Sequence, residues 1–160
     1  MLHDFLCVYY LNAMDKQRRL DEYFMGVAKL TARLSYAERK KVGAVIVKDK
    51  RICSIGYNGT PSKFDNCCED HDADGNLVTK HDVVHAESNA IFWCAKTGIK
   101  TEGATLYLTL SPCSTCALGI IQSGIAKVVY DEEYRDTRGI ELLIGAGIEV
   151  KKYEKDMTHD

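Results

Sequence analysis

Apolar positions in the first third of the chain follow first a helical period and then the pattern of buried strands. Over 19–34 they recur every three or four residues, which predicts a helix packed by one face. Two apolar runs at 42–47 and 52–57, separated by four polar residues, predict a hairpin of largely buried strands. The helical stripe consists of Leu20, Tyr23, Phe24, Val27, Leu30 and Leu34.

Two segments fall outside this regular pattern. The stretch 58–80 is polar and has no sustained period, so we expect a long loop or insertion at about 59–82. A second methionine, Met14, follows the first thirteen residues. We therefore treat 1–16 as an N-terminal arm that the protein could dispense with, and 17–160 as a single domain. An upstream translation start is the open alternative for residues 1–13.

The second half of the chain alternates helices and strands. Strands separated by helices of this length need crossover connections, which place helices on both faces of a sheet. The class predicted is a three-layer α/β fold. The expected elements are a helix over 85–96, a strand over 105–110, a helix over 113–122, a strand over 127–130, a helix over 140–144 and a strand over 148–153.

Composition is that of one ordinary globular domain. The 160 residues are 46% apolar and 28% charged, and 21 basic against 23 acidic residues leave a net charge of −2. Such a balance gives no strong attraction to DNA or to an anionic membrane. The longest apolar run, Phe5 to Leu11, is far shorter than the roughly twenty residues of a membrane span, and no signal-peptide n-region precedes it. We expect a cytoplasmic protein (host cytoplasm if viral) with no nucleic-acid or membrane partner.

The seven cysteines make a disulfide framework the weaker interpretation, because their number is odd and the chain is large enough to fold without cross-links. Cysteines paired beside histidines favour metal ligation. The isolated residues Cys7, Cys53 and Cys94 are better explained as small buried hydrophobes.

Two short motifs stand at successive predicted helix starts: His-Ala-Glu at 85–87 and Pro-Cys-Ser-Thr-Cys at 112–116. Cysteines three apart in a first helical turn lie on one side of the helix, and the helix N-terminus favours their thiolates. With His85 as third ligand, Cys113 and Cys116 would leave a tetrahedral zinc ion one open position, the arrangement typical of catalytic sites.

Glu87 lies two positions after the histidine ligand and can approach that open position without binding the metal. Zinc held by two thiolates carries no formal net charge and acidifies water weakly, so a carboxylate must move the proton. Each motif alone occurs by chance or in structural and redox sites. Together, H-x-E followed by P-C-x-x-C is similar to the pattern of zinc nucleobase deaminases.

The insertion raises a separate question about a second metal. Its thiols and imidazoles could hold a structural zinc, although their spacing matches no standard pattern well. The residues concerned are Cys67, Cys68, His71 and His81.

Beyond the two motifs, the chain resembles deoxycytidylate deaminases of phage or bacterial type over nearly all of 20–153. A Gly-Tyr-Asn-Gly segment followed by a long insertion before His-Ala-Glu distinguishes that family from cytidine deaminases and tRNA adenosine deaminases. The segments that carry the resemblance are 41–47 (KVGAVIV), 56–61 (GYNGTP), 85–91 (HAESNAI), 111–113 with Cys116, 122–125 (QSGI) and 133–135 (EYR).

The resemblance implies a cytidine deaminase-like α/β/α sandwich with a central mixed five-stranded sheet. It also implies zinc-dependent hydrolysis of dCMP to dUMP and ammonia, which supplies dUMP for dTMP synthesis. By the same resemblance, Asn58 lies by the nucleotide sugar and Tyr134 by the phosphate, and Ala86 is a substrate-binding residue. Basic residues before the first strand help hold the phosphate, and Arg39 is our choice because a guanidinium can grip phosphate with two parallel hydrogen bonds.

Plainer interpretations remain open for two of these residues. Arg39 could be a solvated charge beside Lys40 and Lys41. Asn58 could be a turn residue before Gly59.

Members of the family are often hexamers activated by dCTP and inhibited by dTTP, so the resemblance implies a homo-oligomer with these effectors, with Mg²⁺ accompanying the nucleotide. The effector site would include Gly56, Tyr57, Asn58 and Gly59. Two rival functions stay open: deamination of another base or nucleoside, and a zinc-containing nucleotide-binding regulator without activity. Glu87 argues against the second, because a structural zinc site gains nothing from a carboxylate at an open position.

Overall fold

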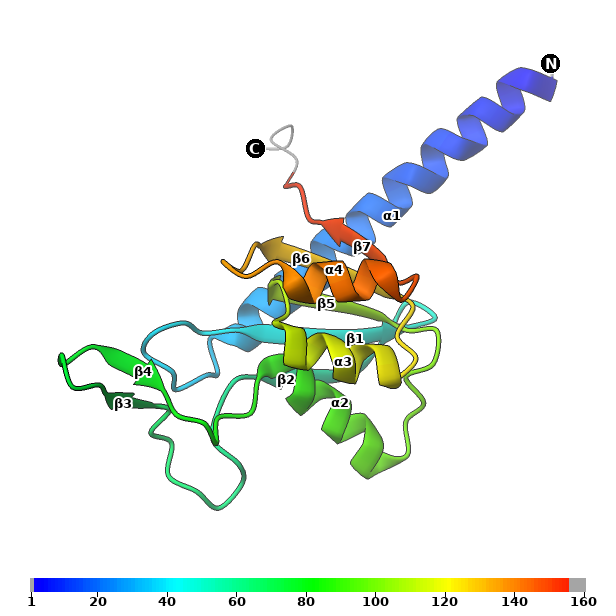
Figure 1. The fold of residues 1–160 in the computed structure, drawn as a ribbon. Helices are drawn as coiled ribbons and strands as arrows, with labels where there is room; N and C mark the ends of the chain where they lie inside the picture. Colours follow the sequence, from blue (N-terminus) through cyan, green and yellow to red (C-terminus); the bar gives the residue numbers. More distant parts are fainter. Residues whose placement is uncertain (1, 156–160) are drawn as a thin grey trace.

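The computed structural model describes the backbone of residues 2–155 and the side chains of 14–155. Figure 1 shows one sheet with helices on both faces and a small separate hairpin. In chain order the elements are α1 (Leu2–Ala32), β1 (Gly43–Lys48), β2 (Arg51–Tyr57), β3 (Glu69–His71), β4 (Leu77–Thr79), α2 (Ala86–Thr97), β5 (Thr105–Leu110), α3 (Ser114–Gln122), β6 (Lys127–Glu132), α4 (Arg138–Gly145) and β7 (Glu149–Lys152).

The main sheet has five strands in the order β2-β1-β5-β6-β7. Strand β1 is antiparallel to both β2 and β5, whereas β5, β6 and β7 are parallel. The β1–β2 turn consists of Asp49 and Lys50 with φ of 50° and 60°, the left-handed pair that a tight hairpin turn requires. Helices α3 and α4 make the parallel crossovers. The predicted mixed five-stranded sheet is confirmed.

Alternate residues of β1 enter two different cores, which creates the three layers. Val45 and Val47 pack with Phe24 and Met25 of α1 on one face. On the opposite face, Ala44 and Ile46 belong to a larger core that includes residues of α2, α3 and α4. Figure 1 shows α1 alone on its side of the sheet. The predicted α/β/α sandwich is therefore confirmed.

Helix α1 begins at Leu2, much earlier than the predicted start at 19. Its N-terminal part extends beyond the sheet (Figure 1), and residues 14–19 are exposed. The expected boundary near 16 thus falls inside one helix, and the dispensability of 1–16 stays a prediction. The side chain of Cys7, predicted to be buried, lies outside the described residues. No helix in the described part of the chain has the length and apolarity of a membrane span.

The insertion is more ordered than its sequence indicates. Strands β3 and β4 form an antiparallel two-stranded sheet where we predicted only loop. The turn between them is closed by the Asp72 carboxylate, which accepts hydrogen bonds from the backbone N–H groups of Asp74 and Asn76. Gly75 there has φ of 81°. Strands of three residues are too short to carry a periodic signal, and the Asp-Gly pair of the turn is the local mark of this hairpin.

A buried carboxylate ties α1 to the far edge of the sheet. Asp21 is 2% exposed and accepts hydrogen bonds from Tyr107 Oη (2.8 Å), Gln17 Nε2 (2.8 Å) and Lys151 Nζ (2.9 Å). Burial raises the pKa of Asp21, but these hydrogen bonds outweigh it, so its pKa lies below the usual 3.8. A lowered pKa in the folded state means that the carboxylate stabilises the fold above pH 3.8.

Replacing Asp21 with asparagine should therefore lower the free energy of unfolding at neutral pH by roughly 2–3 kcal/mol. Since the contribution of Asp21 is lost as the pH falls through its lowered pKa, the difference between variant and parent should narrow below pH 3.8. Urea unfolding at several pH values measures this. Glu22→Gln on the exposed side of α1 is the control, and an equally large effect there would contradict the assignment.

Candidate active site

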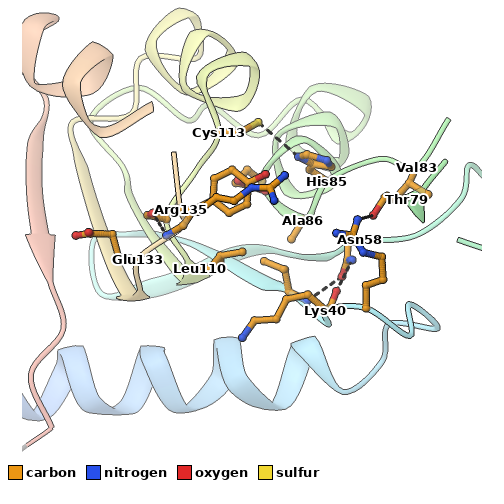
Figure 2. Close-up of a pocket in the computed structure, with 15 residues that line it drawn as sticks. Lys40, Asn58, Thr79, Val83, His85, Ala86, Leu110, Cys113, Glu133 and Arg135 are labelled. Atoms are coloured by element: carbon orange, nitrogen blue, oxygen red, sulfur yellow. Dashed lines mark hydrogen bonds between the residues drawn. The ribbon is translucent and has the colours of Figure 1, made fainter. Parts of the chain in front are cut away.

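The two predicted motifs meet because each stands at the start of a helix. His85 is the N-cap of α2 and Cys113 the N-cap of α3, and these neighbouring helices cover the same face of the sheet. His85 Nδ1 lies 3.3 Å from Cys116 Sγ and 3.7 Å from Cys113 Sγ. Figure 2 shows His85 and Cys113 pointing toward one another. Among the described side chains, these three form the one group of His, Cys and acidic residues spaced to hold a metal ion.

The donor set and spacing fit zinc. With Zn–N and Zn–S bonds of about 2.1 and 2.3 Å, tetrahedral ligands stand about 3.6–3.8 Å apart. Hydrogen bonds from Cys116 and His85 lower the pKa of Cys113 to about 4, so this thiol is ionised at neutral pH. The hydrogen bond with Cys113 raises the pKa of Cys116 in turn, as expected for two thiols sharing one proton. A cation bound here would compensate the second thiolate.

Glu87 lies in the first turn of α2 and is only 4% exposed. Glu87 lines the same cavity as His85 and Cys113. Burial is the largest influence on this carboxyl group and raises its pKa. A carboxyl group in such an environment can both accept and return a proton, which is the property required of a general acid–base.

A cavity of about 370 Å³ opens beside these residues. That volume lies in the range of small-ligand sites. Seven of the predicted site residues line the cavity: Arg39, Asn58, His85, Ala86, Glu87, Cys113 and Tyr134. Residues that sequence reasoning did not assign also line it, among them Lys40, Thr79, Ser111, Glu133 and Arg135. Lys40 and Arg135 stand directly beside predicted site residues in the sequence, and that adjacency is the signal by which they could have been found.

The end of the cavity away from the cysteines is cationic. Figure 2 shows Lys40, Asn58 and Thr79 there. Asn58 Nδ2 donates to the Lys40 carbonyl (2.9 Å), and Asn58 Oδ1 accepts from the Val42 N–H (2.8 Å). The Asn58 side chain therefore holds the backbone that carries the basic residues. A primary amide has further donor and acceptor capacity, so these bonds leave it able to contact a ligand as well.

Tyr134 is fixed at the other wall by its backbone, because its N–H donates to Ser111 Oγ (2.8 Å). Ser111 is 3% exposed and immediately precedes the Pro-Cys motif. One short segment thus places both a candidate metal ligand and Tyr134. The guanidinium of Arg135 stacks over the Tyr134 ring at 5.9 Å.

Of the predicted effector segment, 56–59, only Asn58 lines the cavity. Gly56 is buried against α2, where a Cβ atom would overlap the Ala86 carbonyl oxygen. Gly59 exchanges two backbone hydrogen bonds with Val84, the residue before His85 (3.1 and 2.8 Å). The close approach that Gly56 permits is that of the α2 backbone, and the effector role of 56–59 stays a prediction.

The remaining cysteines with described side chains differ in burial. Cys94 is 1% exposed in the main core, as predicted, and Cys53 packs partly buried against that core. Cys67 is exposed, whereas Cys68 is buried. Within the described residues, no three of Cys67, Cys68, His71 and His81 bring ligand atoms together as the active-site group does.

Gly139 in α4 explains how Cys113 is held. A Cβ atom there would overlap the Pro112 carbonyl oxygen, so α4 packs directly on the backbone of the Pro-Cys segment. Gly139→Ala should displace that segment, lower the zinc content of the purified protein and cost roughly 1–3 kcal/mol of stability. Metal analysis and thermal unfolding measure both. Gly145→Ala, on the same helix with open space around it, should change neither.

Comparison with known proteins agrees with this site. Residues 18–132 match the model of the cytidine and deoxycytidylate deaminase zinc-binding region. A deoxycytidylate deaminase of Mycobacterium phage D29 is 42% identical over 71% of this chain and 94% of its own length. A yeast deoxycytidylate deaminase (Saccharomyces cerevisiae) is 40% identical over 83% of this chain, which spans 44% of the yeast protein.

The fold is also similar to that of a solved deaminase structure. The dCMP deaminase of cyanophage S-TIM5, in complex with dCMP and dUMP, superimposes with a TM-score of 0.78 at 43% identity, covering 84% of this chain and 96% of that one. The region matched by the family model includes His85, Glu87, Cys113 and Cys116. The chain belongs to the cytidine and deoxycytidylate deaminase family.

Proposed function

We propose that this protein catalyses the zinc-dependent hydrolytic deamination of dCMP to dUMP and ammonia, and so supplies dUMP for dTMP synthesis. The observation that carries the proposal is one cavity with a His85–Cys113–Cys116 cluster and buried Glu87 at one end and basic residues at the other. Similarity to a cyanophage enzyme in complex with dCMP and dUMP supports the choice of substrate.

His85, Cys113 and Cys116 would hold the zinc ion. When bound, zinc supplies a Lewis acid that activates the attacking water. Glu87 accepts a proton from this water and returns it to N3 of the cytosine ring, while oxygen adds at C4. A second proton passes through Glu87 to the amino group. The C4–N bond then breaks, and ammonia and dUMP result.

The cationic end of the cavity would bind the 5′-phosphate. Arg39 and Arg135 are the residues best suited to it, since a guanidinium pairs with phosphate through two parallel hydrogen bonds. Lys40 Nζ already pairs with Glu132 at 2.6 Å, which leaves it the weaker candidate. Tyr134 lines the same cavity beside Arg135, and the free capacity of the Asn58 amide suits the sugar.

Turnover tests the proposal. The zinc-loaded protein should lose the ultraviolet absorbance of dCMP with stoichiometric ammonia release, and a chelator should abolish this until zinc is restored. Because phosphate binding positions the ring, kcat/KM for dCMP should exceed that for deoxycytidine by a large factor. Equal rates on both would instead indicate a nucleoside deaminase.

We also propose that dCTP activates the enzyme and dTTP inhibits it, each with Mg²⁺. An effector at 56–59 would act on two neighbours of the segment: Val84 before His85, through Gly59, and the basic loop, through Asn58. Phe92 and Trp93 expose 60% and 53% of their surfaces on α2, which supports a homo-oligomer, and we favour a hexamer. We expect an oligomer in solution whose dCMP saturation curve is sigmoidal without effector and hyperbolic with dCTP. Identical hyperbolic curves from a monomer would refute the regulation but not the deaminase reaction.

A further inference from the structure

The basic loop at 36–41 needs an anchor. It joins α1 to β1, has no regular secondary structure, and carries three consecutive cations at 39–41. Like charges in sequence repel one another, so a loop of this composition has no internal reason to hold one conformation. Arg39 and Lys40 nevertheless both line the cavity.

Asn58 holds the end of this loop at Lys40 and Val42, and Glu69 at the start of β3 anchors its middle. Its carboxylate accepts hydrogen bonds from the backbone N–H of Glu38 (3.2 Å to each oxygen) and from that of Arg39 (3.3 Å). Glu69 is 8% exposed, and burying a carboxylate is costly unless it is hydrogen-bonded. These hydrogen bonds all come from the backbone that presents Arg39.

The hairpin holds the same loop at two further points. Cys68 forms a small buried cluster with Ala37 and with Val83, so apolar contact covers the loop next to the Glu69 bonds. Thr79 on β4 accepts a hydrogen bond at Oγ1 from Arg39 Nη1 (3.0 Å), and Figure 2 shows Thr79 beside the cavity. One strand of the hairpin thus fixes the backbone of Arg39, and the other fixes its guanidinium.

We propose that Glu69 is a positioning residue that makes the insertion a specificity element for the substrate phosphate. By fixing the backbone at 38–39, it holds Arg39 ready to pair with phosphate. The loop is then already ordered in the free protein, so nucleotide binding loses less conformational entropy. The inference rests on the proposed function, because it assigns the basic loop to the phosphate. A substrate without phosphate does not contact the basic loop. Its KM and Kd should therefore not change when Glu69 is replaced.

The test compares dCMP with deoxycytidine in the zinc-loaded protein. Glu69→Ala should raise KM and Kd for dCMP about tenfold or more and change kcat little, while both constants for deoxycytidine stay as in the parent. Glu69→Gln retains one acceptor oxygen and should fall between the two. Thr79→Ala, which leaves the backbone anchor intact, should show the same selectivity more weakly. Asp70→Asn, on the exposed side of the same strand, is the matched control.

Two results would overturn the inference. One is an equal loss for dCMP and deoxycytidine in Glu69→Gln and Thr79→Ala, which would mean a general structural role. The other is unchanged dCMP affinity in all the Glu69 variants. The Kd for dCMP is measured independently of turnover. A parent protein without deaminase activity would refute the proposed reaction. A selective loss of dCMP binding in the Glu69 variants would still support the positioning role of Glu69.

Discussion

Glu87→Gln should lower kcat for dCMP by about a thousandfold or more while the protein still binds zinc and nucleotide. Glutamine keeps the shape of the side chain and can still hydrogen-bond, but it cannot take a proton from water and return it. Because Glu87 is only 4% exposed, solvent cannot readily replace it as a proton carrier. Stopped assays of dUMP formation, with metal analysis and dCMP binding on the same sample, measure all three properties.

The matched control for Glu87 is Glu141→Gln, an exposed glutamate in the first turn of α4. It should leave kcat unchanged. A Glu87→Gln protein that lacks zinc would make Glu87 a metal ligand. One that turns over normally would remove it from the chemistry and revive the interpretation of the chain as a nucleotide-binding regulator.

Cys113→Ala should abolish both zinc binding and activity. The His85–Cys116 pair that remains offers two ligands, fewer than the three of a catalytic zinc site. Because Cys113 is the N-cap of α3 and its side chain makes no capping bond, its removal should affect the metal far more than the helix. Zinc per chain by mass spectrometry and dCMP turnover are the measurements.

Cys94→Ala provides the comparison, since Cys94 is a buried thiol on α2 without a ligand role. It should lose some stability but keep full zinc. If Cys113→Ala retained stoichiometric zinc and turnover, the metal site would have to lie elsewhere in the protein.

Residues whose role depends on a repeating pattern or a short motif could be predicted from the sequence. The apolar runs of β1 and β2 and the alternation from α2 to β7 gave the layers, and the two motifs gave the three candidate ligands and Glu87. Both motifs fall at helix starts, so each could be recognised from a few neighbouring residues, although their meeting depends on α2 and α3 packing on the same face of the sheet. The strongest parts of the prediction are therefore local ones.

Glu69 shows what could not be predicted. Nothing in Cys-Glu-Asp-His marks one carboxylate as buried and the next as exposed, because Glu69 acts on a loop thirty residues away. Gly139 is similar: its importance lies in the Pro112 carbonyl against which it packs. The early start of α1 was missed because Phe5 to Leu11 is one nearly continuous apolar run rather than the one-sided stripe seen further along the helix. Such features arise from tertiary contacts and leave no periodic signal.

The central claim is that this site adds water to dCMP and expels ammonia. The most direct test incubates the zinc-loaded protein with dCMP in water whose oxygen is isotopically heavy and determines the product by mass spectrometry. We expect dUMP that carries one heavy oxygen on the base, with one ammonia per dUMP, and a rate of product formation lower by about a thousandfold or more from the Glu87→Gln variant. Recovery of unlabelled dCMP under these conditions, or ammonia release without label in the base, would contradict it.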